Sequence, residues 1–158
     1  MGIWNFLFGK PVKTNDAFFG EMLFMEVKID PAKSYFEGWR HFEPINDNIE
    51  VCVSGSLSGP TQVQKDFFRQ VENNYALLIR KVIPIVESRF QEWEAEFKTD
   101  NFGQKFKPVY IFIPDCVKKP LEWEIAFESM PELVDYNYPY VLTIEMIDSE
   151  PQHISVNQ

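Results

Sequence analysis

The chain has 158 residues, of which 45% are hydrophobic, and this composition predicts one domain with a substantial core. The net charge of -9 excludes general binding to nucleic acid or to anionic lipid, because phosphates would be repelled. The 2 cysteines are too few for a disulfide framework, and an apolar stretch of membrane-spanning length, about 18 residues, is missing, so we expect a cytoplasmic protein.

Residues 1–16 are interpreted as an apolar N-terminal segment followed by a linker at 11–16, and residues 17–158 as a single domain. The apolar segment could dock on its own domain or on another protein chain. It could also rest on a membrane through five apolar side chains, Ile3, Trp4, Phe6, Leu7 and Phe8. The membrane interpretation has the least support, because Lys10 and Lys13 supply little positive charge nearby.

Three strands are expected in the first half of the domain, at 17–29, 34–43 and 49–56. The second strand alternates, with Trp39 and His41 on one face and Phe36 and Phe42 on the other. Gly38 between aromatic residues indicates a bulge or a close approach of backbone. Because short connections separate the three expected strands, the sequence predicts an antiparallel meander.

A long helix is expected from Thr61 to about Lys98, where apolar residues recur every three or four positions. Thr61 and Gln64 have the spacing of a capping box, which marks the first turn. A straight helix of this length would exceed the dimensions of a compact domain. We therefore expect a kink, or a junction of two helices, near Pro84.

Three further strands are expected at 107–113, 121–128 and 140–147, with a short edge strand at 153–156. The second of these alternates apolar and polar residues, as an antiparallel strand with one wet face does. The predicted fold is α+β, with βββ-α-βββ order, a mostly antiparallel sheet, and the long helix packed on one face.

Catalytic motifs are absent from the sequence, and neither a metal ligand set nor a cofactor is predicted. Trp39, His41 and Cys52 could together form a small-ligand or hydrolytic pocket if their strands are neighbours. Core packing is the competing explanation for the aromatic strand and for the cysteine. A non-enzymatic protein is therefore expected.

Among the candidate binding groups in the sequence, carboxylates form the most concentrated clusters. Glu122, Glu124 and Glu128 share one strand face, and Glu145 could lie beside them. Such a face could bind basic side chains or a divalent cation, and simple solvation would give the same pattern. Glu92 and Glu96 lie in the last expected helical turns, where negative charge opposes the helix dipole, and they indicate a second acidic surface.

Four segments carry a resemblance: FFGEM at 18–22, YFEGW at 35–39, GPTQVQ at 59–64 and WEIAFE at 123–128. Through them the chain resembles small bacterial α+β proteins of the kind found beside polymorphic toxins. The resemblance covers most of the chain, and its motifs are structural, so it transfers no catalytic residue. It implies a binding role of the immunity-protein type.

The leading hypothesis is therefore an interaction protein that binds a basic protein partner through its acidic surfaces. The pocket at Trp39, His41 and Cys52 and the membrane contact of the N-terminal segment are the alternatives. A homodimer formed through the long helix is also open, although covering a sheet would require the same apolar stripe.

Overall fold

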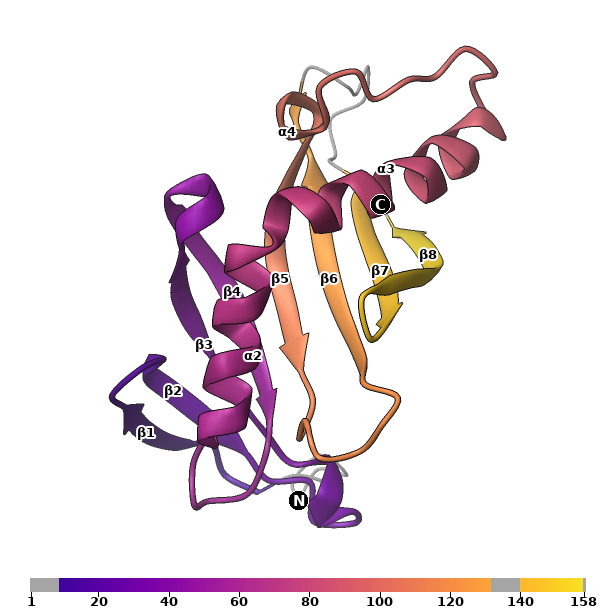
Figure 1. Ribbon diagram of the computed structural model, residues 1–158. Coiled ribbons are helices and arrows are strands. Elements are labelled where there is room, and N and C mark those ends of the chain that lie inside the picture. The colour runs from indigo at the N-terminus through magenta and orange to yellow at the C-terminus, as the bar shows by residue number, and fades with distance from the viewer. Residues whose placement is uncertain (1–8, 132–139, 158) are drawn as a thin grey trace.

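The computed structural model describes residues 9–131 and 140–157, which form an α+β fold with one eight-stranded sheet (Figure 1). The strands are β1 (Val12–Asp16), β2 (Gly20–Met25), β3 (Tyr35–Phe42), β4 (Asp47–Ser54), β5 (Phe106–Ile113), β6 (Glu122–Ser129), β7 (Val141–Ile147) and β8 (Glu150–Asn157). The helices are α2 (Gln62–Asn73), α3 (Tyr75–Gln91) and α4 (Phe102–Lys105), with short 3₁₀ turns at Pro31–Lys33 and Glu43–Ile45.

The strands lie in the sheet in their sequence order, from β1 to β8. Within the described part of the chain, every neighbouring pair is antiparallel except β4 and β5, which are parallel. A parallel pair needs a crossover connection, and α2 and α3 supply it on one face of the sheet (Figure 1). The fold therefore consists of two meanders, β1–β4 and β5–β8, joined at one parallel seam.

The predicted βββ-α-βββ order is wrong, since the sheet is mixed and has eight strands. The missed strand is β1, which occupies residues predicted to be a linker. Its sequence, VKTND, contains a single apolar residue, so hydrophobic alternation cannot reveal it. The Asp16 carboxylate accepts hydrogen bonds from the Phe18 and Phe19 amides at 2.8 and 2.9 Å, which fixes the turn into β2.

The single long helix is also wrong, because the helical segment breaks at Asn74 and ends at Gln91. The Asn74 amide and its side-chain Nδ2 both donate to the Gln70 carbonyl, at 3.1 and 2.8 Å, and thereby close α2. Pro84, where the kink was expected, lies inside α3 on its exposed side. Pro84 removes one backbone donor, and α3 continues through it to Gln91.

The start of α2 is as predicted. The Gln64 amide donates to Thr61 Oγ1 at 3.4 Å, and the Thr61 amide donates to Gln64 Oε1 at 2.9 Å, which completes the capping box. Gln64 Nε2 also donates to the Ser54 and Pro114 carbonyls, at 2.6 and 2.8 Å. The buried Gln64 side chain therefore holds the first turn of α2 against the segments at the ends of β4 and β5.

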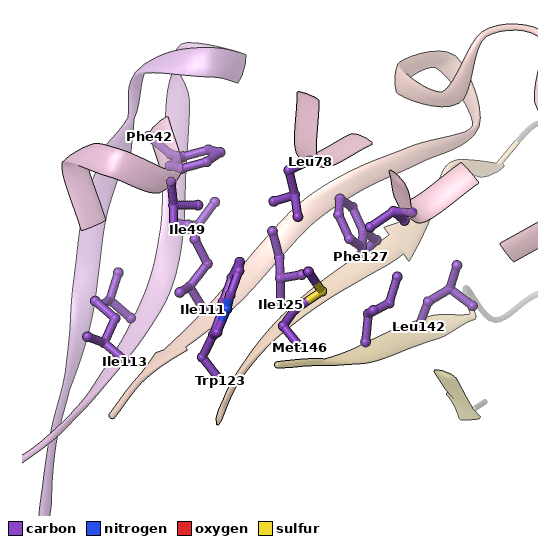
Figure 2. Packing of buried hydrophobic residues seen from close by; sticks show 14 of the residues in the cluster. Phe42, Ile49, Leu78, Ile111, Ile113, Trp123, Ile125, Phe127, Leu142 and Met146 are labelled. Atoms are coloured by element: carbon purple, nitrogen blue, oxygen red, sulfur yellow. The ribbon is translucent and has the colours of Figure 1, made fainter. Parts of the chain in front are cut away.

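The core lies between the two helices and the sheet face that they cover (Figure 2). Phe42, Ile49, Ile111, Ile125 and Leu142 are fully buried on that face. The helices contribute the following buried side chains: Phe68, Val71, Leu78, Val82, Val86 and Phe90. Because strand residues alternate between faces, every neighbour of these inward residues points to the opposite face of the sheet.

Gly38 confirms the expected close approach of backbone. A Cβ atom at this position would lie 2.8 Å from the Glu21 carbonyl oxygen on the neighbouring strand. Glycine therefore allows β2 and β3 to pair closely at this point.

Candidate functional site

The face of the sheet opposite α2 and α3 is the candidate site, and we call it the open face. Within the described residues, no helix covers it. Its central side chains point outward from β3 to β7 and are Glu37, Trp39, Glu50, Cys52, Tyr110, Phe112, Glu122, Glu124, Ala126, Glu128, Thr143 and Glu145. The open face thus combines aromatic rings with carboxylates, whereas the covered face is almost entirely apolar.

Four of the predicted partner-binding glutamates lie together on the open face. Glu122, Glu124 and Glu128 project from β6, and Glu145 lies directly opposite Glu124 on β7. Like charges in directly opposed positions destabilise a strand pair. In residues 9–131 and 140–157, none of these four carboxylates has an ion pair. The sheet therefore tolerates concentrated negative charge that the described chain does not neutralise.

Two more glutamates, Glu37 on β3 and Glu50 on β4, extend this charge across the seam. Sequence reasoning did not assign them to the site. Their outward position could be derived from the alternation of β3 and β4, but their proximity to β6 depends on the parallel pairing of β4 with β5. That pairing joins residues far apart in the chain and has no local signal.

Trp39, Glu50 and Tyr110 form a row across three strands, with Glu50 directly opposite both aromatic residues. The row continues through Ala126 on β6, which is directly opposite Tyr110. The small Ala126 side chain leaves a hollow between the aromatic residues and Glu128. Trp39 is 66% exposed, an unusual position for the largest apolar side chain.

Trp39, His41 and Cys52 all lie on the open face, but the structure does not bring His41 and Cys52 together. Cys52 is opposite Glu37, four residues from His41 along β3, which corresponds to about 13 Å at roughly 3.3 Å per residue. His41 Nε2 instead lies 3.6 Å from Glu43 Oε1. The geometry gives no support to a cysteine–histidine pair.

The Cys52 thiol is also poorly suited to nucleophilic attack. Burial raises its pKa to about 12, and a hydrogen bond from Tyr110 lowers it too little to compensate. Nearby carboxylates, including Glu37 and Glu50, raise it further. The thiol is therefore protonated at neutral pH, whereas the thiolate is the reactive form.

Glu92 and Glu96 do not belong to the open face. Glu92 follows the last residue of α3 and forms an ion pair with Arg89, and Glu96 lies exposed in the segment after the helix. Because α3 ends at Gln91, Glu94 and Glu96 are not part of a helical turn. The six predicted partner-binding residues therefore divide into four on the open face and two beside the end of α3.

The N-terminal residues predicted as a docking segment or membrane contact lie outside the described residues. The described helices include none with the length and apolar character needed to cross a bilayer. In the same part of the chain, no group of three or more His, Cys, Asp or Glu side chains is arranged to hold a metal ion.

Comparisons with known proteins add no family to these observations. A scan against protein families, a search of curated proteins and a search of solved structures each find no match to this chain.

Proposed function

We propose that the protein is a non-enzymatic interaction module that binds a basic protein partner through its open face. The observation that carries this proposal is the set of unpaired carboxylates on an uncovered sheet, with Glu124 directly opposed to Glu145. A cationic partner would relieve the repulsion between them, and complementary charge would accelerate the encounter. The sequence resemblance suggests one form of such binding, in which an immunity-type protein neutralises a basic toxin.

A partner made of a second copy of the chain fits this face less well, because glutamates would meet glutamates. Lys33, Lys118 and Lys119 border the end of the face beside Glu122, and the strand lysines Lys107 and Lys13 lie within the face. Lys107 Nζ lies 2.6 Å from Asp47 Oδ2, and Lys13 Nζ lies 3.4 Å from Glu21 Oε1, so each already has an acidic neighbour. The net charge of the whole chain has the same sign as the face.

The test is affinity capture of proteins from the native cell lysate with three forms of the immobilised protein. Glu124→Gln with Glu145→Gln removes two charges from the open face, and Glu92→Gln with Glu96→Gln removes the same number elsewhere. We expect wild type and the second variant to retain the same basic protein, released by salt, and the first variant to lose it. Equal capture by all three forms, or equal loss in both variants, would contradict the proposal.

A further inference from the structure

We infer that the hollow beside Trp39 on the open face is a subsite for a single guanidinium group, supplied by an arginine of the partner. This inference rests on the proposed function and names the side chain that the face recognises. We call the hollow the Trp39 hollow; it is bounded by Trp39, Glu50, Tyr110, Ala126, Glu128 and Thr143.

The register of three strands builds the aromatic side of the Trp39 hollow. Trp39 on β3 and Tyr110 on β5 flank Glu50 on β4, since each is directly opposite it. Directly opposed residues have Cβ atoms about 5 Å apart, and both aromatic residues line the same hollow as Glu50. A cation that is held by Glu50 and lies over the face of either ring is attracted by the quadrupole of that ring.

The second carboxylate comes from β6. Glu128 lies two residues beyond Ala126 on the same face, and both border the Trp39 hollow. The cation nearest to Glu128 in register is Lys107, directly opposite it on β5, but the Lys107 ammonium is 2.6 Å from Asp47. Within the described residues, neither Glu50 nor Glu128 has an ion pair.

Surrounding charges distinguish the Trp39 hollow from a second hollow, which includes Glu124 and Glu145. This second hollow lies at the end of the sheet and is also bordered by Lys33, Lys118 and Lys119. Among the described residues, no lysine or arginine borders the Trp39 hollow. Beside Trp39, a cationic side chain of the partner therefore meets carboxylates and aromatic rings without a lysine or arginine lining the same hollow.

The exposed indole favours a guanidinium over an ammonium. A guanidinium is planar and weakly hydrated, so it stacks on an aromatic face and can hydrogen-bond to a carboxylate in the same plane. Tyr110 adds an uncharged ring whose hydroxyl hydrogen-bonds to Cys52, since burial, together with Cys52 and nearby glutamates, raises the pKa of Tyr110 well above its usual range. Exposed Trp side chains with this combination of apolar area and polar neighbours are frequent centres of binding energy.

The experiment uses the full chain and the tripeptide acetyl-Gly-Arg-Gly-amide, with the neutral citrulline peptide as its matched control. The indole N–H resonance of Trp39, assigned with a Trp39→Phe variant, is followed by NMR during each titration. We expect a saturable shift with the arginine peptide and none with the citrulline peptide. Glu50→Gln with Glu128→Gln should weaken binding at least fivefold, and Glu92→Gln with Glu96→Gln should leave it unchanged.

A Trp39 resonance that does not move, or that moves equally with citrulline, overturns the inference. A lysine peptide that binds as tightly as the arginine peptide overturns the assignment of a guanidinium. The two proposals fail separately. Capture of a basic protein that depends on Glu124 and Glu145, without any arginine response at Trp39, would leave the interaction function standing and remove the subsite. An arginine response at Trp39, without capture that depends on Glu124 and Glu145, would keep the guanidinium subsite and remove the binding surface proposed at those two glutamates.

Discussion

Replacing Gln64 by leucine should destabilise the protein more than any change at an exposed position of α2. Gln64 is 1% exposed. Its side-chain amide accepts a hydrogen bond from the Thr61 amide and donates to the Ser54 and Pro114 carbonyls. Leucine has a similar size but no polar atom, so all three groups lose this partner. At roughly 1 to 1.5 kcal/mol for each of the three groups deprived of a partner, the expected loss is about 3 to 4.5 kcal/mol.

Urea denaturation measures this loss as a lower midpoint with an unchanged slope. Gln70→Leu is the matched control, since Gln70 lies exposed on the same helix and its change should stay within about 0.5 kcal/mol. Thr61→Ala removes the cap alone and should cost about 1 kcal/mol. A Gln64→Leu protein within 1 kcal/mol of wild type would refute the idea that this one side chain joins α2 to the ends of β4 and β5.

Two further substitutions test other local interactions. Burial raises the pKa of Asp16, but the Lys65 ammonium at 2.7 Å and two backbone amides lower it more, so its folded-state pKa lies below the unfolded value of about 3.9. The stabilisation by the charged Asp16 is therefore fully present above the unfolded-state pKa and is lost as the pH falls through the folded-state pKa. In paired denaturation curves, Asp16→Asn should lower the free energy of unfolding by about 1 kcal/mol at pH 7 and by almost nothing near pH 2. A cost independent of pH would contradict this account. Gly38→Ala places a Cβ against the Glu21 carbonyl and should lower the free energy of unfolding by about 1 to 3 kcal/mol. Gly103→Ala is the control, because the space around Gly103 is open and the change should be neutral or stabilising. Equal thermal midpoints for the two variants would show that β2 and β3 separate at little cost.

Local patterns predicted the strongly apolar elements of the fold and failed where a polar group decides the structure. Strands near β3, β4, β5, β6 and β7 follow from alternation, and the start of α2 follows from Thr61 and Gln64. The break at Asn74 depends on an asparagine side chain bonding to its own helix, which apolar spacing does not record. Apolar spacing also fails to predict the polar strand β1, because its place at the sheet edge depends on pairing with β2.

The candidate site shows the same division between local and distant information. The outward direction of Glu122, Glu124 and Glu128 follows from the alternation of a single strand, and their shared face with Glu145 follows from the pairing of β6 with β7. The grouping of Trp39 with Tyr110 could not be predicted, because it needs the parallel seam between β4 and β5. Residues that meet only through a crossover carry no signal in the sequence between them.

The seam between β4 and β5 also has a consequence for the order in which the chain folds. In the described structure, every other pair of neighbouring strands is antiparallel and separated by a much shorter stretch of chain, so these pairs can form by short-range closure within each half of the chain. Parallel pairing across the three intervening helices, α2, α3 and α4, requires a long loop to close, which slows folding. Gln64 bonds to Ser54 and Pro114 at this junction, so its side chain becomes satisfied only when both halves have met. A Gln64 substitution should therefore raise the unfolding rate if the seam closes after the rate-limiting barrier, and lower the folding rate if closing the seam is that barrier.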